Sequence, residues 1–117
     1  MARLSVKIDM GNRAKLGPGK VQLLELIDRH GSIRSAANAM DMSYRRAWLL
    51  LKETEALMGA PVIVAETGGS KGGGATLTPL GRAVTEKYRA IEKRASASVA
   101  AELRALIGLA RNRKIHS

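Results

Sequence analysis

Residues 31–58 (GSIRSAANAMDMSYRRAWLLLKETEALM) are the part of this sequence that most restricts its possible folds. Ser32 can cap a short helix, because its hydroxyl can accept a hydrogen bond from an unpaired N–H of the first helical turn. Residues 41–43 then interrupt the pattern, and Ser43 can cap a second, longer helix in the same way. The stretch therefore predicts two helices joined by a tight turn, which is the pattern of a helix-turn-helix unit.

The second predicted helix has two different faces. Mostly apolar residues recur at helical spacing on one side, as expected of a face turned toward a core: Ala47, Leu50, Leu51, Thr54, Leu57 and Met58. The other side carries Arg45, Trp48, Leu49 and Lys52. We expect Trp48 to pack between helices, because an indole is large and rarely left exposed. Contact with a DNA backbone is the alternative for this side chain.

Two arginines stand at the start of this helix, against the usual preference. Arg45 and Arg46 lie in its first predicted turn, where the helix dipole disfavours each positive charge by about 0.3–1 kcal/mol. An anion outside the chain would relieve this conflict, and DNA phosphate is the obvious candidate. A pair of solvated arginines on an exposed turn is the simpler alternative.

The charge balance also indicates a polyanionic partner. Among 117 residues, 20 Lys and Arg face 10 Asp and Glu, which gives a net charge of +10 and a pI of about 10.7. Such a balance favours nucleic acid or an acidic membrane surface. Cysteine is absent, which excludes disulfides and thiolate metal sites. The first ten residues lack the apolar run of a signal peptide, and no segment approaches the roughly 20 apolar residues of a membrane span. We therefore expect a soluble cytoplasmic protein with no membrane partner.

Other elements surround the predicted pair of helices. Residues 3–9 alternate apolar and polar side chains, which predicts a short half-buried strand. Residues 20–30 have apolar residues at helical spacing and are stopped by a glycine, so a third helix precedes the pair. Residues 61–66 and 76–78 predict two strands on either side of the glycine-rich segment 67–75. A hairpin at this place, after a helix-turn-helix, would form a wing.

A long helix is expected to follow the wing. Thr78 and Pro79 predict its start, and residues 80–107 would make a helix of about 42 Å at 1.5 Å per residue. An apolar stripe spaced by three or four residues runs along it: Leu80, Val84, Tyr88, Ile91, Ala95, Val99, Leu103 and Leu106. So long a stripe predicts pairing with a second copy, and hence a homodimer. Packing back onto its own domain is the alternative, and the small residues 95–98 permit a close crossing or a bend.

The sequence offers no convincing catalytic or ligand-binding motif. GPGK at residues 17–20 lacks both the first glycine and the hydroxyl of a phosphate-binding loop. The segment TGGSKGGG does not fit a dinucleotide fingerprint. His30 and His116 have no carboxylate or cysteine at ligand spacing, so no metal site is expected. We predict a protein that is not an enzyme, with no catalytic residues and no cofactor.

Several segments in order and spacing resemble a known family: GPGK..LLELI, GSIRSAANAM, MSYRRAW and TGGSKGGGATLTPLG. Together they are similar to the N-terminal DNA-binding domain of the ModE-type molybdate-dependent transcriptional regulators, over about residues 17–85. A looser frame, GSI..AA followed by LT..G, is shared with LysR-type regulators. The resemblance implies a winged-helix homodimer that binds operator DNA. Full-length members continue into domains that hold molybdate, whereas this sequence stops after the long helix, so no molybdate binding is expected in this chain.

The expected fold is mainly α with a small β-wing. It comprises a winged helix-turn-helix domain (1–79), a long dimerisation helix (80–108) and a basic tail (109–117). Tyr44, Arg45 and Arg46 would enter the major groove of double-stranded DNA, reading bases or clamping phosphates. The full set of expected DNA-binding residues is Ser32, Arg34, Ser35, Ser43, Tyr44, Arg45, Arg46, Lys52, Ser70 and Lys71. The expected dimerisation residues are Leu80, Val84, Tyr88, Ile91, Val99, Leu103 and Leu106.

Two other functions fit the same residues. A nucleoid-type architectural protein would bind DNA without sequence preference, and an adaptor would use the winged helix to bind a protein. Binding to a random duplex, compared with binding to the region upstream of its own gene, separates these alternatives from a transcriptional regulator.

Overall fold

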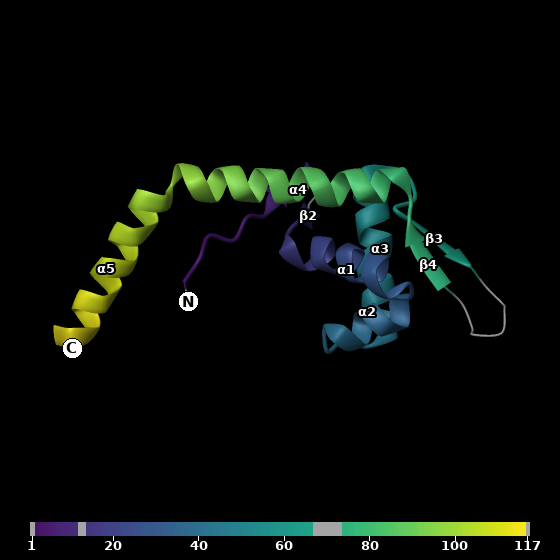
Figure 1. Ribbon diagram of the computed structural model, residues 1–117, viewed down its shortest axis with the longest axis horizontal. Coiled ribbons are helices and arrows are strands. Elements are labelled where there is room, and N and C mark those ends of the chain that lie inside the picture. Colours follow the sequence, from purple (N-terminus) through teal and green to yellow (C-terminus); the bar gives the residue numbers. More distant parts are fainter. Residues whose placement is uncertain (1, 12–13, 67–73, 117) are drawn as a thin grey trace.

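Three helices that pack against one another form the body of the molecule (Figure 1). They are α1 (Pro18–His30), α2 (Ile33–Ala39) and α3 (Tyr44–Met58). The computed structural model describes residues 2–11, 14–66 and 74–116. The three helices predicted from the sequence are therefore all present, and α1 begins two residues earlier than the expected start at residue 20.

The ends of these helices are set by the residues that the sequence suggested. The Ser32 Oγ accepts a hydrogen bond of 3.0 Å from the Ser35 N–H, and the Ser43 Oγ accepts one of 3.1 Å from the Arg46 N–H. Gly31 and Gly59 end α1 and α3 in the left-handed conformation, each with a φ of 75°, which glycine adopts without a steric penalty. These local signals set the boundaries of the three helices.

A single apolar core lies between the three helices, the wing and the first half of the next helix. Its fully buried members include Leu23, Leu24 and Ile27 of α1 and Leu51 of α3. Thr54 is also buried, and its hydroxyl donates a hydrogen bond of 2.8 Å to the Leu50 carbonyl. The expected inner face of α3 is thus confirmed, including its one polar residue.

The N-terminal segment forms much less sheet than expected. Only β1 (Ile8–Asp9) is a strand, paired antiparallel with β2 (Lys15–Leu16) so that Ile8 faces Leu16. The predicted alternation of burial nevertheless holds through residues 3–9. The segment before Ile8 is held by a side chain and not by strand pairing. The Tyr88 hydroxyl donates a hydrogen bond of 2.6 Å to the Val6 carbonyl.

The wing is an antiparallel pair, β3 (Ile63–Glu66) and β4 (Gly74–Leu77), with Ile63 opposite Leu77. Its second strand is tied to the helical body, because the Ala75 N–H donates a hydrogen bond of 2.8 Å to the carbonyl of Gly31. Most of the predicted glycine-rich tip, residues 67–73, lies outside the described residues. The two strands confirm the predicted hairpin.

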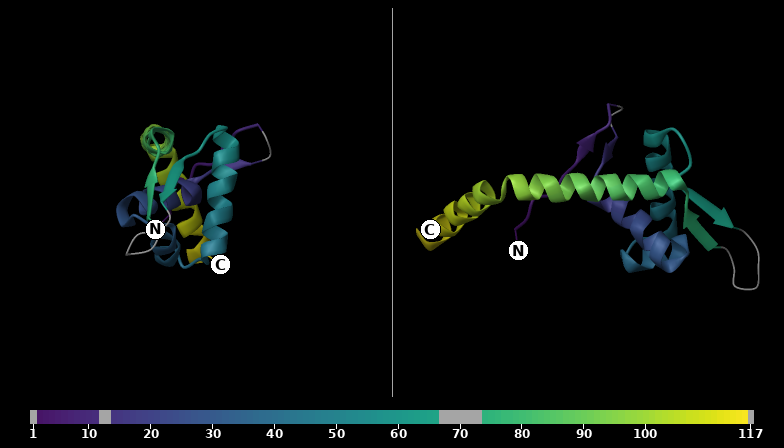
Figure 2. Two further views of the ribbon diagram at one scale, coloured as in Figure 1. Left: turned by 90° about the vertical axis from the view of Figure 1, so that its right-hand side faces the viewer. Right: turned by 45° about the horizontal axis from the view of Figure 1, so that its top comes forward.

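Helix α4 (Pro79–Ser98) follows the wing and crosses the body, as Figure 2 shows from two further directions. Its start is capped by Thr78, whose Oγ1 accepts a hydrogen bond of 3.0 Å from the Gly81 N–H. A Cβ at Gly81 would lie 2.1 Å from the Val62 carbonyl oxygen, so only glycine allows α4 to approach the chain this closely.

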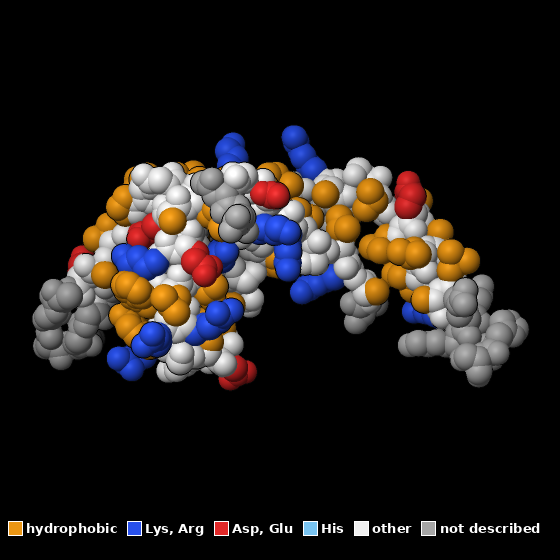
Figure 3. Space-filling view, turned by 180° about the vertical axis from the view of Figure 1, so that it is seen from behind, with side chains coloured by type: hydrophobic (Ala, Val, Ile, Leu, Met, Phe, Trp, Pro, Cys, Tyr) orange, Lys and Arg blue, Asp and Glu red, His pale blue; other side chains and the backbone are white. Residues whose placement is uncertain are grey.

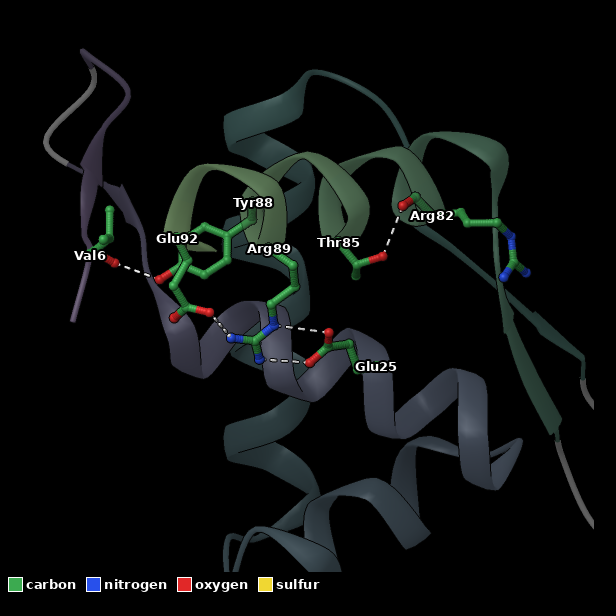
Figure 4. A network of polar contacts seen from close by, with 7 residues as sticks. All are labelled: Val6, Glu25, Arg82, Thr85, Tyr88, Arg89 and Glu92. Carbon is green, nitrogen blue, oxygen red and sulfur yellow. Dashed lines mark hydrogen bonds and ion pairs between the residues drawn. The ribbon is translucent and has the colours of Figure 1, made fainter. Parts of the chain in front are cut away.

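Ion pairs join α4 to α1 (Figure 4). The Arg89 guanidinium binds Glu25 of α1 through two hydrogen bonds of 2.7 and 3.0 Å, and it binds Glu92 at 2.8 Å. The hydrogen bonds to Glu25, the largest cause, raise the pKa of Arg89 above its ordinary value. Arg82 forms a second, more exposed pair with Asp28 at 3.3 Å.

The expected continuous helix over residues 80–107 is wrong, because the helix is interrupted at Val99. Helix α5 (Ala100–His116) begins after this residue and turns away from the line of α4 (Figure 1). The Ser98 hydroxyl donates a hydrogen bond of 2.9 Å to the Ala95 carbonyl, a local bond of the kind that bends helices. Helix α5 also extends through most of the segment expected to be a tail (109–117).

The interruption leaves an elongated molecule. Its extents are 61 × 27 × 24 Å and its radius of gyration is 17.6 Å, against about 13 Å for a compact chain of this length. Figure 2 shows α5 projecting from the end of α4, beyond the three-helix body.

The apolar stripe that predicted a dimer interface is divided by this geometry. Val84 and Tyr88 are 5% and 1% exposed inside a single chain, so their assignment to an interface between copies is wrong. They pack on the core together with the partly buried Leu80. Further along, Ile91, Leu106 and Leu109 are 46%, 63% and 61% exposed. The alternative of a helix folded onto its own domain is correct for the first half of α4 only.

Candidate nucleic-acid interface

The outward side of α3 is basic at its ends and apolar in its middle. Tyr44, Arg45, Trp48, Leu49 and Lys52 are all exposed, and they follow one another along successive turns of the helix. Figure 3 views this side, where Lys and Arg side chains lie around apolar ones next to the wing. The face is therefore suited to a partner that carries both anionic and apolar groups.

The expected packing of Trp48 between helices is wrong, since its side chain is 43% exposed. The reason is its position on α3. Ala47, Leu51 and Thr54 already fill the buried side, and residue 48 lies about 100° further around the helix than residue 47. The core has no space left for an indole on that side.

The two arginines at the start of α3 lie at the positive end of the helix dipole, as the sequence predicted. Arg45 and Arg46 lie in the first turn, both are exposed, and no acidic residue accompanies them there. Neither forms an ion pair with any residue in the described part of the chain. Their charges add to the positive end of the helix dipole and remain available to an external anion.

Helix α2 brings further polar groups beside this start. Arg34 and Ser35 are exposed, and the Arg34 guanidinium lies 5.2 Å from the centre of the Tyr44 ring. This cation–π contact connects α2 to the first residue of α3 and orients both side chains. Ser32 uses its oxygen as the cap of α2, so only its hydroxyl hydrogen is left to donate to a phosphate.

Lys52, at the far end of the exposed face, is held by two contacts. Its ammonium lies 5.3 Å from the centre of the Trp48 ring and 3.2 Å from the Glu55 carboxylate. The other oxygen of Glu55 accepts a hydrogen bond of 3.0 Å from the Val62 N–H, at the base of the wing. The charge of Lys52 is thus partly balanced, unlike those of Arg45 and Arg46.

The predicted wing contacts, Ser70 and Lys71, lie outside the described residues. The strands β3 and β4 place the hairpin to one side of the helix-turn-helix (Figure 1). The role of these two residues stays a prediction.

A basic groove on the other side of α3 was not found from the sequence. It has a volume of about 790 Å³ and is lined by Lys7, Lys15, Lys20 and Arg46, together with Glu53. Lys20 is already engaged, since it lies 3.3 Å from Glu53 and donates to the Lys15 carbonyl at 2.8 Å. The missed signal was the pair of lysines at positions 7 and 15, which the pairing of β1 with β2 brings together beside α3.

Other kinds of site are not supported by the described residues. They contain no group of three or more His, Cys, Asp or Glu side chains that could hold a metal ion. Within the same ranges, no helix has both the length and the apolar character needed to cross a membrane.

Known proteins that are similar in sequence show the family to which this chain belongs. Residues 19–82 match the model of the bacterial regulatory helix-turn-helix proteins of the lysR family. The chain is 39% identical over 92 residues to the molybdenum transport protein ModE of Azotobacter vinelandii, covering 79% of this chain and 33% of that protein. It is 44% identical over 79 residues to the molybdenum-pterin-binding protein MopB of Rhodobacter capsulatus, covering 68% of this chain and 29% of that protein.

A third relative carries a functional description in its name. The chain is 30% identical over 87 residues to the DNA-binding transcriptional dual regulator ModE of Escherichia coli K12, covering 74% of this chain and 33% of that protein. The chain therefore spans about a third of the length of these relatives. The resemblance noted in the sequence is confirmed over the helix-turn-helix and wing.

Proposed function

The chain belongs to the lysR family of bacterial regulatory helix-turn-helix proteins, and from this premise we propose that it is a DNA-binding transcriptional regulator. The observation that carries the proposal is the start of α3. There, a serine-capped first turn presents Arg45 and Arg46 to solvent without ion pairs in the described part of the chain. A regulator of this kind would act in the cytoplasm and would not be an enzyme.

In the proposed complex, α3 lies in the major groove of double-stranded DNA. Arg45 and Arg46 approach base edges or phosphates at its start. Arg34 and Ser35 of α2 bind phosphates of one DNA strand. Lys52 binds phosphates of the other strand. The wing residues Ser70 and Lys71 reach the flanking groove. Figure 3 supports this arrangement, because several Lys and Arg side chains, with some Asp and Glu among them, lie around the apolar patch on this side of the molecule.

The basic groove beside β2 extends the proposed contact. Lys7 and Lys15 are exposed and line the same groove as Arg46. A phosphate running past the start of α3 would therefore meet positive charge on both sides of this helix. This contact would add to affinity without adding sequence information.

We also propose that the chain acts as a homodimer through the end of α4 and through α5. The support is the exposure of Ile91, Leu106 and Leu109 on helices that project from the body. Val99 and Leu103, which are half-buried, continue this surface. A symmetric dimer would set two copies of α3 about 34 Å apart, one turn of DNA, and would match a palindromic site.

Molybdate is not proposed as a ligand of this chain. A cleft between the N-terminal segment, α1 and α4 holds Arg3, Arg29, Arg89 and Lys93, as many cations as the groove beside α3. It also contains the carboxylates of Glu25 and Glu92, which already bind Arg89. Two carboxylates disfavour an oxyanion in the same space.

The test is DNA binding by electrophoretic mobility shift, on the region upstream of the gene and on a random duplex. If about 6–10 phosphates are neutralised, affinity should fall by about 10³–10⁵-fold between 50 and 200 mM salt. Replacing Arg45 and Arg46 together by Ala should weaken binding strongly and reduce the salt slope by up to about four, because a homodimer loses two cations in each of its two copies. Adding molybdate should leave the affinity unchanged.

A matched control removes the same charge elsewhere. Lys87 and Arg94 are exposed on α4, and their double replacement by Ala should have a much smaller effect on DNA affinity. Equal losses of DNA affinity in the two double variants would show that α3 is not the DNA-binding helix. Equal affinity for the upstream and random duplexes would favour an architectural protein, and no binding to either would favour an adaptor.

A further inference from the structure

The exposed face of α3 has an apolar centre that the proposed phosphate contacts do not use. Trp48 and Leu49 are 43% and 41% exposed, one turn beyond Tyr44 and Arg45. Leaving an indole and an isobutyl group in water is unfavourable. The part of the chain that the structure describes covers each of them only in part, so a partner that covers the rest would gain affinity.

The chemistry around this pair narrows the choice of partner. Arg45 and Arg46 lie on one side of it along the helix, and Lys52 lies on the other, 5.3 Å from the Trp48 ring centre. A protein partner with an apolar patch would have to be ringed by acidic groups to match. Double-stranded DNA meets the requirement directly, because two phosphate strands border a groove whose floor carries apolar groups at thymine only.

We infer that Trp48 and Leu49 recognise thymine, by packing against the 5-methyl groups that thymine presents in the major groove. This inference rests on the proposed function and assigns sequence specificity to two residues that carry no charge. Lys52 restrains the indole through its contact with the ring face, so the apolar surface is positioned before DNA binds. The arginines and Lys52 then supply affinity and register, and the apolar pair supplies selection among bases.

The experiment removes single methyl groups from the DNA. Duplexes that bind the wild-type protein are first enriched from a random library. Each thymine of the enriched site is then replaced, one at a time, by deoxyuridine, which lacks only the 5-methyl group and keeps the pairing and the O4 acceptor. Affinities are measured by mobility shift at one fixed salt concentration.

We expect a loss of about 3- to 10-fold at one or two thymines in each half-site for the wild-type protein, since burial of one methyl is worth about that factor. At those thymines the loss should shrink to less than about 2-fold in Trp48→Ala or in Leu49→Ala, because the partner of the methyl is gone. Both side chains are exposed, so both variants should fold, which circular dichroism verifies.

The matched control is Ile91→Ala. Ile91 is 46% exposed, much like Trp48, but it lies on α4 away from α3. This variant should keep the full deoxyuridine penalty, whatever it does to the overall affinity.

Three outcomes separate the inference from the proposed function. If no duplex is enriched, the proposed function fails, and this inference fails with it. If duplexes are enriched but no deoxyuridine substitution weakens binding, thymine recognition is overturned and the regulator remains. If the penalty persists unchanged in both Trp48→Ala and Leu49→Ala, another residue contacts the methyl groups and the assignment is wrong.

Discussion

Apolar side chains recur in both the first half of α4 and the helix α5, but they gather on one face only in α4, and only those of α4 are covered by their own chain. Val84 and Tyr88 are buried on the core, whereas Leu106 and Leu109 are more than half exposed. In α4 the spacing of apolar residues shows that the helix has a face to bury. It does not show whether that face meets the same molecule or another one.

Helix lengths explain where the apolar residues change from covered to exposed. Helix α1 has 13 residues and α4 has 20, which correspond to about 20 and 30 Å. Gly81 brings the start of α4 directly onto the Val62 carbonyl, and the Arg89–Glu25 pair closes the contact with α1. Ser96 is the last residue of α4 that lines the cleft with the N-terminal segment and α1, and beyond it the chain continues into solvent (Figure 2).

The largest effect should come from charging the buried half of the repeat. Val84→Asp would place a carboxylate in the core, and we expect a loss of about 3 kcal/mol or more in the free energy of unfolding. Ile91→Asp, on the exposed half, should cost less than about 1 kcal/mol in the unfolding of a single chain, measured at a concentration too low for dimers. Urea denaturation followed by circular dichroism measures both. Similar losses in the two variants would contradict the division of the stripe.

Charging the uncovered half should act on assembly instead. Leu106→Glu combined with Leu109→Glu should leave the fold intact and weaken self-association by about 100-fold or more, because each buried leucine contributes about 1.5–3 kcal/mol. Sedimentation at micromolar concentration measures this change. Arg104→Glu, at an exposed position on the same helix, controls for the change in charge. A wild-type protein that sediments as a monomer would refute the proposed dimer.

The smallest effect should come from the hydroxyl group of Tyr88, a polar group in the buried half of the stripe. Tyr88→Phe removes the hydrogen bond from the Tyr88 hydroxyl to the Val6 carbonyl, which should cost about 0.5–1.5 kcal/mol at neutral pH. Tyr44→Phe is the control, because Tyr44 is exposed and should tolerate the change. Thermal unfolding compares the two.

The contribution of Tyr88 should depend on pH in one direction. Burial raises the pKa of Tyr88 above its ordinary value of 10.0, so the folded state favours the protonated phenol. The stabilisation is complete below pH 10 and is lost as the pH rises through the raised pKa. The difference between wild type and Tyr88→Phe should therefore shrink in strongly alkaline solution. A difference that grows with pH would show that the sign is wrong.

Local signals account for what the sequence predicted well. Ser32, Ser43 and Thr78 cap the helices that they were expected to cap, and Gly31 and Gly59 end theirs. Each depends on a few neighbouring residues. The interruption at Val99 was harder to place, because neither proline nor glycine marks it. Only the small residues before it indicated that a bend was possible.

The errors concern contacts between distant segments. Trp48 was expected inside because of its size, but the space on that side of α3 is decided by how α2 and α3 pack. Lys7 and Lys15 joined the candidate interface only through the pairing of β1 with β2. Single-sequence periodicity contains neither kind of information.

The position of Trp48 also gives the molecule an internal optical reporter. It is the single tryptophan of the chain, so indole light emission comes from one place, on the exposed face of α3. Because the ring is already partly in water in the folded protein, unfolding should change its emission colour little. A groove closing over it would exclude water and shift the emission to shorter wavelength. The natural protein, without any attached dye, should therefore signal occupancy of this face more clearly than it signals its own folding.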